Sequence, residues 1–398
     1  MKLSKRLDVI EPSMTLKVTA RAAELKAQGI DVISFGAGEP DFDTPAHIKE
    51  AAKRALDAGA TKYTAVAGTP ELRKAAAAWF SKDHGLDVTA GEVMVSAGAK
   101  QVIYNAFQAL LNEGDEVILP APYWVSYSEI AKLAGGVPVP VPSSAADNFE
   151  VRPEAIAEAI TPKTKMIVVV SPSNPTGAVY SEATLRGISD LVVKHNLWML
   201  TDDIYRYLCY GNAKFIQPAT FGPEVRKRTI IADGVSKAYA MTGWRIGFAC
   251  APKEVIEAMS TLQGQSTTNA ATVSQAAALA AITGPQEEVE RMRLEFDKRR
   301  QFMVKGLNAM PGVKCVEPMG AFYAFPDVSS FNGKRTPAGQ EIKNDLDLCE
   351  YLIGEGRVAL VPGSAFFAPG FVRLSYATSQ ANIEKGLARI AEALAALK

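Results

Sequence analysis

The sequence has few of the side chains that build metal sites and disulfides. Its 398 residues include four cysteines and three histidines, and no two cysteines form a CxxC pair. Zinc sites need closely spaced thiolates or imidazoles, so this scatter argues against one. We expect no metal site and four reduced thiols, as is usual for a cytosolic protein.

Excess charge of either sign and long apolar runs are missing as well. Lysine plus arginine and aspartate plus glutamate both number 43, which leaves no positive charge to neutralise the phosphates of a nucleic acid. No apolar run reaches the roughly 18 residues that a membrane helix needs. The basic stretch Met1 to Asp8 lacks the apolar segment that follows it in a signal peptide. We therefore expect a cytoplasmic protein with no nucleic-acid partner and no membrane association.

The sequence does contain a regular alternation of helical stretches and short apolar runs, from residue 46 to about residue 280. This alternation is typical of βαβ units built around a mainly parallel sheet. Several runs are apolar without alternation, as expected for strands that helices cover on both faces. The expected strands are residues 92–96, 116–119, 166–170, 198–201 and 229–232.

A second part is expected after Gly284-Pro285, which interrupts this pattern. Residues 286–309 predict a long charged helix that bridges into it, and residues 310–398 mix short strands with a closing helix. The helix carries four arginines that we place on its solvated face: Arg291, Arg293, Arg299 and Arg300.

The predicted fold class is α/β, with a large domain whose mainly parallel sheet is sandwiched by helices, plus a smaller α+β domain. Residues 1–45 are expected to form an N-terminal arm and part of the small domain. Residues 46–285 form the large domain, and residues 286–398 form the bridging helix and the small C-terminal domain.

Lys237 follows an apolar strand, and Arg245 follows it by one short loop. A lysine amine forms a Schiff base with a carbonyl only when it is partly unprotonated, and burial beside a cation such as Arg245 lowers its pKa. The arginine fork also suits a phosphate. Taken alone, however, a Ser-Lys pair in a loop is more often an exposed surface lysine.

Other polar motifs follow the expected strands, and ligands of open parallel sheets bind at the carboxyl ends of strands. Residues 96–101 are a small-residue loop that opens a helix, which either binds an anion through backbone N–H groups or only forms a tight turn. Residues 171–177 form a rigid turn that presents Asn174. Asp202 and Tyr205 follow the strand at 198–201 and can serve one aromatic ring, the acid at a ring nitrogen and the phenol at a ring oxygen. The alternative is a helix N-cap and a core tyrosine.

Near the end of the chain, Arg373 interrupts an otherwise apolar strand. A buried arginine normally has a partner, so Arg373 predicts either a structural ion pair or a clamp for a substrate carboxylate.

Two other motifs fail on inspection. The glycine pattern that begins at Gly36 has Asp41 in place of its third glycine, which excludes a nicotinamide-binding loop. The surroundings of Ser236 loosely resemble a hydrolase nucleophile elbow. All three histidines precede Ser236, whereas that fold places its histidine after the serine.

Taken together, the motifs resemble those of class I/II aminotransferases of the pyridoxal-phosphate fold type I superfamily, and among them the bacterial aspartate aminotransferases. The resemblance runs nearly from end to end. Its motifs are Gly-Glu-Pro-Asp-Phe-Asp-Thr-Pro at 38–45, Lys-Tyr-Thr at 62–64, Pro-Tyr-Trp at 122–124, Asn-Pro-Thr-Gly at 174–177, Asp-Asp-Ile-Tyr at 202–205, Ser-Lys at 236–237 with Gly-Trp-Arg-Ile-Gly at 243–247, and Arg-Leu-Ser-Tyr-Ala at 373–377.

The resemblance implies pyridoxal 5′-phosphate as cofactor, bound by the large domain, and a homodimer. It implies that Lys237 carries the aldimine and moves the proton at the substrate α-carbon, that Asp202 pairs with the pyridinium nitrogen, and that Tyr205 acts with it at the ring. The implied cofactor-binding residues are Gly98, Ala99, Lys100, Trp124, Asn174, Asp202, Tyr205, Ser236, Lys237 and Arg245, with Tyr63 from the neighbouring subunit. The implied substrate-binding residues are Gly38, Trp124, Asn174 and Arg373.

The implied reaction is transamination between L-aspartate and 2-oxoglutarate, which gives oxaloacetate and L-glutamate. An aromatic, prephenate or alanine aminotransferase and a C–S lyase of the same fold are the alternatives. Two positions depart from the family pattern. Gly234 stands where many relatives have a serine, and Glu11 stands where relatives with prephenate activity tend to have a lysine or arginine. Glu11 therefore argues against prephenate as a substrate.

Overall fold

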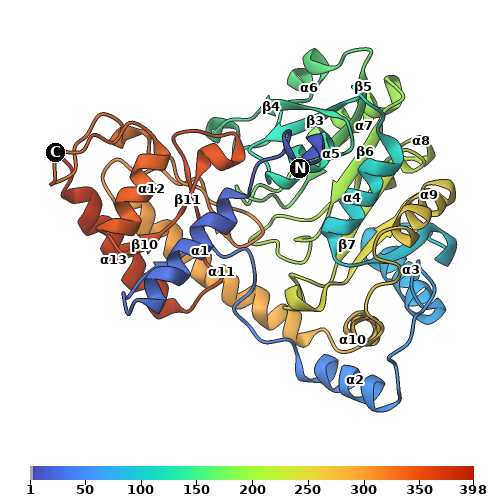
Figure 1. Ribbon diagram of the computed structural model, residues 1–398. Helices are drawn as coiled ribbons and strands as arrows, with labels where there is room; N and C mark the ends of the chain where they lie inside the picture. Colours follow the sequence, from blue (N-terminus) through green and yellow to red (C-terminus); the bar gives the residue numbers. More distant parts are fainter. Residues whose placement is uncertain (1–2) are drawn as a thin grey trace.

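The computed structural model describes residues 3–398 (Figure 1), and a seven-stranded sheet is its largest element. The strand order is β2-β8-β7-β6-β5-β3-β4. Strands β3 to β7 run parallel, while β8 is antiparallel to both of its neighbours. The strands are β2 (Val93–Ser96), β3 (Glu116–Ala121), β4 (Val137–Pro142), β5 (Thr164–Val170), β6 (Trp198–Asp202), β7 (Thr229–Gly234) and β8 (Gly247–Cys250).

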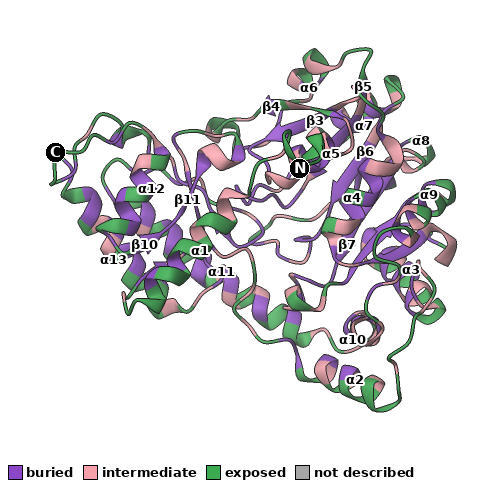
Figure 2. Cartoon of the chain, viewed as in Figure 1, coloured by how far each residue is buried: buried purple, intermediate pink, exposed green. Residues whose placement is uncertain are grey.

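Helices cover both faces of this sheet, which explains why its central strands are apolar without alternation. In β6, Met199 packs into the hydrophobic cluster on one face and its neighbour Leu200 into the cluster on the other. Figure 2 shows the same arrangement, with buried strands inside helices whose outer faces are exposed. The helices are α2 (Ala46–Asp57), α3 (Pro70–His84), α4 (Ala99–Leu110), α5 (Ser126–Leu133), α6 (Pro153–Ala159), α7 (Glu182–Lys194), α8 (Pro223–Arg226), α9 (Lys253–Gly264) and α10 (Thr272–Thr283).

The smaller part joins both ends of the chain. Strand β1 (Ile33–Ser34) pairs in parallel with β10 (Val358–Ala359), and β11 (Val361–Pro362), β12 (Val372–Ser375) and β9 (Tyr323–Ala324) form an antiparallel sheet. Figure 1 shows α11 extending from the neighbourhood of α10 toward α12 and α13. Helix α1 packs against β1, β10 and β11. These helices are α1 (Met14–Ala27), α11 (Glu287–Asn308), α12 (Asp345–Gly354) and α13 (Gln380–Ala395). The 3-10 helices are η1 (Lys5–Leu7), η2 (Ala90–Glu92), η3 (Ala145–Asp147), η4 (Pro218–Phe221), η5 (Thr242–Trp244), η6 (Ser329–Phe331) and η7 (Gly363–Phe366).

The predicted fold class is confirmed, although two strands were not anticipated. Strand β4 reads Val-Pro-Val-Pro-Val-Pro, and proline is tolerated there because β4 lies at the edge of the sheet, where half of the backbone N–H groups need no partner. Strand β8 begins at Gly247, the last residue of the glycine-rich motif that follows Lys237. The domain boundaries at residues 45 and 285 stay a prediction.

The expectation for the arginines of α11 was wrong for two of the four. Arg299 is buried and pairs with Asp41 at 2.8 Å, and Arg300 is buried and pairs with Asp297 at 2.7 Å. Burial of Arg299 is possible because Asp41, which lies outside the helix, neutralises its charge. The residue pattern of the helix alone cannot show this partner.

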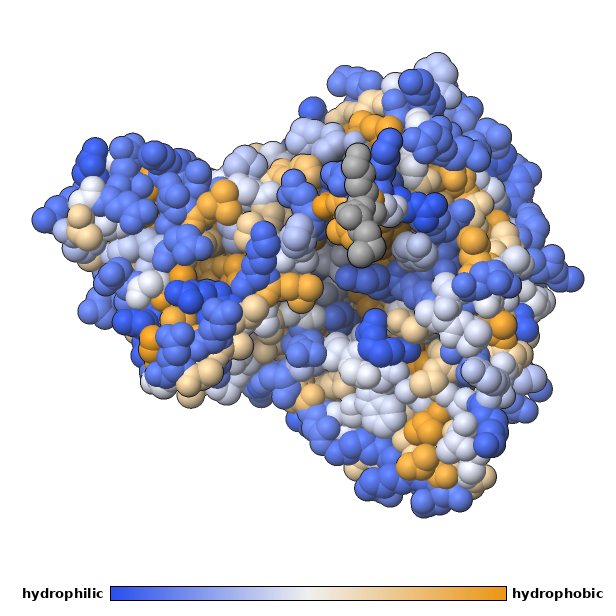
Figure 3. Space-filling model, viewed as in Figure 1, coloured by the Kyte–Doolittle hydropathy of each residue, from blue (hydrophilic) through white to orange (hydrophobic). Residues whose placement is uncertain are grey.

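Figure 3 shows a mainly hydrophilic face with scattered apolar groups. Within residues 3–398, no helix has the length and apolar character required to cross a membrane.

Candidate functional site

A cavity of about 400 Å³ opens at the carboxyl ends of β5, β6 and β7. This is the edge at which the sequence places its polar motifs. The predicted site residues that line the cavity are Gly38, Ala99, Lys100, Trp124, Asn174, Asp202, Tyr205, Ser236, Lys237, Arg245 and Arg373. Segments far apart in the sequence therefore meet around one space.

Lys237 lies in the loop after β7, and its Nζ donates a hydrogen bond to the Gly38 carbonyl oxygen at 2.6 Å. Burial lowers the pKa of the Lys237 amine to about 8, against the opposing charges of Glu39 and Asp202. The charge of Arg245 also lowers the pKa of Lys237, as expected, but burial is the larger cause. An amine with this pKa is partly neutral near physiological pH and can act as a nucleophile or base.

Asp202 ends β6 and is buried. Its Oδ2 accepts a hydrogen bond from the Tyr127 hydroxyl at 2.6 Å, and its Oδ1 accepts one from the Ile204 backbone at 3.3 Å. Burial raises the pKa of Asp202, while these hydrogen bonds and the charge of Lys237 lower it. No helix follows Asp202, so the N-cap alternative is wrong. Tyr127 was missed because it is 75 residues from Asp202 in the chain and nothing in its local sequence marks it.

Tyr205 is also buried, and its hydroxyl forms a hydrogen bond of 2.8 Å with the hydroxyl of Tyr323. Tyr323 comes from β9 in the smaller part of the molecule. Tyr323 was not predicted as a site residue, because only the tertiary fold brings β9 close to the end of β6.

Arg373 in β12 is 1% exposed, and its hydrogen-bond partners are all neutral oxygens. One Nη donates to Asn174 Oδ1 at 2.9 Å and the other to the Gly36 carbonyl at 3.0 Å. Its Nε has no partner among the described residues, and its guanidinium lies 4.5 Å from the centroid of the Tyr323 ring. Arg373 forms no ion pair with a carboxylate among residues 3–398, so the predicted alternative of a structural ion pair is wrong. The charge of Arg373 remains available to an anion in the cavity.

A second positive region lies where α4 begins. Gly98 precedes α4 with φ of 89°, which strains any residue with a side chain, and a Cβ on it would lie 2.4 Å from Arg245 Nη2 and would displace that guanidinium. Arg245 donates to the carbonyls of Thr242 at 2.8 Å and Ala97 at 3.2 Å, which holds its guanidinium beside the free N–H groups of the first helical turn. The Lys100 Nζ lies 4.6 Å from the centroid of the Trp124 ring. A helix N-terminus with two cations is suited to a phosphate.

Four positions singled out from the sequence do not line this cavity, and they are Gly98, described above, Tyr63, Glu11 and Gly234. Tyr63 is 88% exposed. Glu11 is exposed, and its backbone N–H donates to Glu129 Oε2 at 2.8 Å. At Gly234 a Cβ would lie 2.9 Å from the Ile246 carbonyl oxygen, so the close approach of β8 leaves little room for a serine there.

These groups fit an aromatic aldehyde that carries a phosphate. The cavity combines an amine of lowered pKa, a buried carboxylate, a phenol and a cationic end at a helix N-terminus. Residues 3–398 hold no group of three or more His, Cys, Asp or Glu side chains arranged to bind a metal ion.

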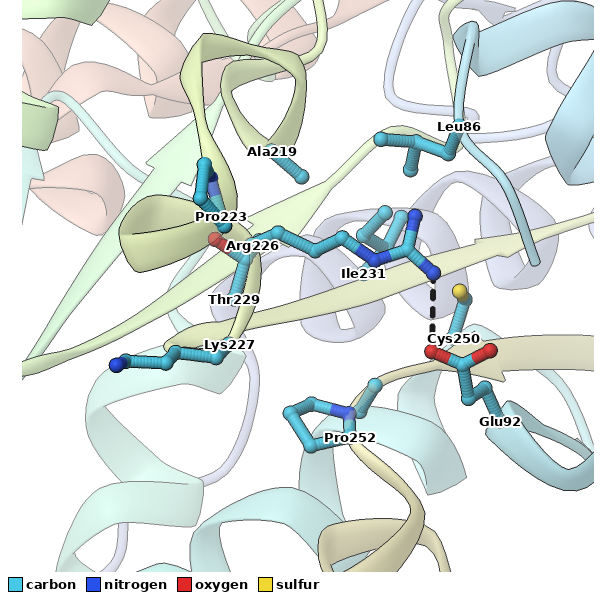
Figure 4. Close-up of a pocket in the computed structure, with 11 residues that line it drawn as sticks. Leu86, Glu92, Ala219, Pro223, Arg226, Lys227, Thr229, Ile231, Cys250 and Pro252 are labelled. Carbon is cyan, nitrogen blue, oxygen red and sulfur yellow. Dashed lines mark hydrogen bonds and ion pairs between the residues drawn. The ribbon is translucent and has the colours of Figure 1, made fainter. Parts of the chain in front are cut away.

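A second cavity, of about 170 Å³, lies at the opposite edge of the sheet, where β7 begins and β8 ends. Figure 4 shows Arg226 reaching across it to Glu92, and the two pair at 2.9 Å. Burial raises the pKa of Cys250 in its wall to about 12, so this thiol is unreactive. None of the predicted site residues lines this cavity.

Comparison with known proteins gives one family. The model of the family "Aminotransferase class I and II" matches residues 30–390. The aspartate aminotransferase of Rhizobium meliloti (strain 1021) is 47% identical over 98% of this chain and 95% of its own. The aspartate/prephenate aminotransferase of Cereibacter sphaeroides is 48% identical over 98% of this chain and 97% of its own.

Solved structures agree with these sequences. The crystal structure of the aspartate aminotransferase from Rhizobium meliloti superposes with a TM-score of 0.97 at 46% identity and covers 100% of both chains. That of the Thermus thermophilus aspartate aminotransferase with maleate superposes with a TM-score of 0.92 at 46% identity, over 99% of this chain and 100% of its own. The similarity thus extends over the whole fold.

Proposed function

The chain belongs to the class I and II aminotransferase family, and from this premise we propose that it transfers the amino group of L-aspartate to 2-oxoglutarate, giving oxaloacetate and L-glutamate. The enzyme uses pyridoxal 5′-phosphate, as its family does. When bound, this cofactor supplies a carbonyl that condenses with amines and an aromatic ring that accepts electrons from the substrate α-carbon.

Lys237 is assigned two tasks, which are to hold the cofactor covalently and to move the proton at the substrate α-carbon. Support comes from its amine, whose pKa of about 8 leaves a substantial neutral fraction at physiological pH. Its hydrogen bond to the Gly38 carbonyl at 2.6 Å directs the amine into the cavity.

Asp202 is assigned to hold the ring nitrogen protonated, and Tyr205 and Asn174 to bond the ring oxygen. The carboxylate of Asp202 is suited to this task because the Tyr127 hydroxyl and the Ile204 N–H stabilise its charged form in a buried position. The residues assigned to the phosphate are Gly98, Ala99, Lys100, Ser236 and Arg245, and Trp124 is assigned to the ring face.

The observation behind the proposed substrate class is the unpaired charge of Arg373. A buried guanidinium that bonds only neutral oxygens, with one N–H free, favours an incoming carboxylate. We assign it to the α-carboxylate, with Gly38, Trp124 and Asn174 completing the substrate site.

A homodimer is proposed as the working form, with Tyr63 completing the site of the partner subunit. The 88% exposure of the Tyr63 ring supports this, because a large aromatic side chain is rarely so exposed without a partner. Further apolar side chains exposed near the N-terminus are Leu3, Leu7, Val9 and Leu16. A cytoplasmic location is proposed as well, and the unpaired state of the four cysteines supports a reducing compartment.

The experiment is a panel of amino acids assayed against 2-oxoglutarate with purified enzyme. Aspartate should give the highest kcat/KM, with alanine, phenylalanine and prephenate well below it. A higher kcat/KM for phenylalanine or prephenate would replace the proposal by the aromatic alternative. The Cereibacter relative is named for both aspartate and prephenate, which is why prephenate is included in the panel. Release of pyruvate with ammonia or sulfide would indicate a lyase.

A further inference from the structure

A second group of buried ionisable side chains lies outside the cavity, and three of its four members are close in sequence to cavity residues. It comprises His84 at the end of α3, Asp203 and Arg206 after β6, and Asp233 in β7. Asp203 is the immediate neighbour of Asp202, and Asp233 precedes Lys237 by four residues. All four are less than a tenth exposed, so their charges have to balance without help from water.

The one arginine of this group already has anionic partners. Arg206 Nε donates to Asp233 Oδ2 at 2.7 Å, and its Nη2 donates to Asp83 Oδ2 at 3.1 Å. Its guanidinium also lies 4.2 Å from the centroid of the Trp79 ring and 3.9 Å from that of Tyr207. The cation is thus matched by two carboxylates, and neither of them is Asp203.

Asp203 has no cation of its own. The Gln217 amide donates to Asp203 Oδ2 at 2.5 Å, and this amide is neutral. His84 Nε2 lies 3.3 Å from Asp203 Oδ2 and 3.5 Å from Asp233 Oδ2, without the alignment of a hydrogen bond. Burial, followed by the charge of Arg206, holds the pKa of the His84 imidazole well below its usual value, so His84 is neutral.

The adjacent carboxyl of Asp202 is in a different position. It accepts hydrogen bonds from the Tyr127 hydroxyl and the Ile204 N–H, and the charge of Lys237 favours its ionised form. When two neighbouring carboxyls compete for one negative charge, the one with more donors and a nearby cation keeps it.

We propose that Asp203 is protonated at neutral pH and acts as a positioning residue, because its neutral carboxyl leaves the negative charge of the pair on Asp202. This inference rests on the proposed function, in which Asp202 serves the ring nitrogen of the cofactor. A second ionised carboxylate beside Asp202 would repel its negative charge and would push Asp202 toward its protonated form.

Asp203 meets titratable groups on every element packed against it. They are His84 from α3, Asp202 from β6, Arg206 from the following turn, Asp233 from β7 and Cys250 from β8, with Asp83 and Tyr207 beyond Arg206. Burial raises the pKa of Asp203 well above its ordinary value, and the charges of Asp233 and Asp202 raise it further, while the charge of Arg206 and a hydrogen bond with Thr201 lower it.

Infrared spectroscopy of the holoenzyme tests the protonation directly. A protonated carboxyl has a C=O stretch that is separate from the bands of carboxylates and amides. At neutral pH, the wild-type spectrum minus that of Asp203→Asn should contain this band. Asp345→Asn is the matched control, because the buried carboxyl of Asp345 accepts three hydrogen bonds, from Ser364 N, Ser364 Oγ and Gly370 N, and its replacement should remove no band of a protonated carboxyl. A difference spectrum that contains a lost carboxylate band instead would overturn the proposal.

The pH at which the absorbance of the bound cofactor changes tests the effect on the site. Asparagine mimics a neutral Asp203, so Asp203→Asn should leave this midpoint in place. Arg206→Met removes a buried positive charge and should raise the midpoint, which shows that the measurement senses the cluster. A lowered midpoint in Asp203→Asn would mean that a negative charge had been removed, and it would refute the proposal.

If Asp203→Asn does not fold, wild-type enzyme labelled with ¹³C at its aspartate carboxyls replaces it. The protonated band should then shift with the label at neutral pH, and its absence would refute the proposal. None of these measurements depends on turnover, so failure of the inference is distinguishable from failure of the aspartate assay.

Discussion

Replacing Arg373 by lysine separates its positive charge from its geometry. In the enzyme the guanidinium is fully buried, spans Asn174 Oδ1 at 2.9 Å and the Gly36 carbonyl at 3.0 Å, and stacks over the Tyr323 ring. A lysine ammonium keeps the charge but has neither the planar fork nor the stacking surface. Arg373→Lys should therefore impair amino-acid binding and leave cofactor binding intact.

The size of the effect follows from the contacts that are lost. A hydrogen bond to a charged group contributes about 1.5–3 kcal/mol, and the fork offers a carboxylate two parallel bonds where lysine offers one. Loss of stacking on Tyr323 adds up to about 1 kcal/mol. The sum is about 3 kcal/mol, which corresponds to a loss in kcat/KM of about 10²-fold.

Steady-state kinetics with aspartate and 2-oxoglutarate measure this loss, and the visible spectrum checks the cofactor. Arg300→Lys is the matched control. Arg300 is also buried, but it pairs with Asp297 and Glu317 away from the cavity, so its substitution should lower stability and leave KM unchanged. An unchanged kcat/KM for aspartate in Arg373→Lys would show that Arg373 is structural.

Further predictions concern the lysine, the dimer and the substrate. Lys237→Ala should lose multiple-turnover transamination and the visible band of attached cofactor, and a wild-type spectrum would contradict this. The rate at which apoenzyme takes up pyridoxal 5′-phosphate should rise with pH and level off above about 8, because the lowered pKa makes the Lys237 amine neutral there, whereas a rise that continued to pH 10 would indicate an ordinary lysine. Light scattering should give a dimeric mass, and a fully active monomer would disprove the shared site. Mixing Tyr63→Phe with Lys237→Ala subunits should restore one active site per heterodimer. If Glu11 faces the substrate, Glu11→Lys should raise kcat/KM for prephenate by replacing repulsion with attraction, and no change would place Glu11 outside the site.

The family and the main elements of the site were accessible from the sequence because they depend on local order along the chain. Apolar runs without alternation predicted covered parallel strands, and the carboxyl ends of such strands meet at one edge. Asn174, Asp202 and Lys237 each lie at the end of a strand or in the loop that follows it, so their placement around one cavity required no knowledge of packing.

Errors arose where a residue's environment comes from distant segments. The residue pattern of a helix cannot show that Asp41, which is distant in the sequence, pairs with Arg299. The buried Arg299 was therefore expected at the surface. Strand β4 was missed because its prolines conceal an edge strand, whose position depends on the order of the whole sheet.

The sequence by itself determined the family, the fold class and the segments that carry the chemistry, because these follow from short-range patterns and from the order of motifs. Only the tertiary structure decided which charges are matched. Arg373 bonds neutral oxygens, Asp202 has Tyr127 as a donor, and Asp203 has no cation because Arg206 turns to Asp233. Coulomb energies and burial depend on distances in space rather than on separation along the chain, so the charge state of the site exists only in the folded molecule.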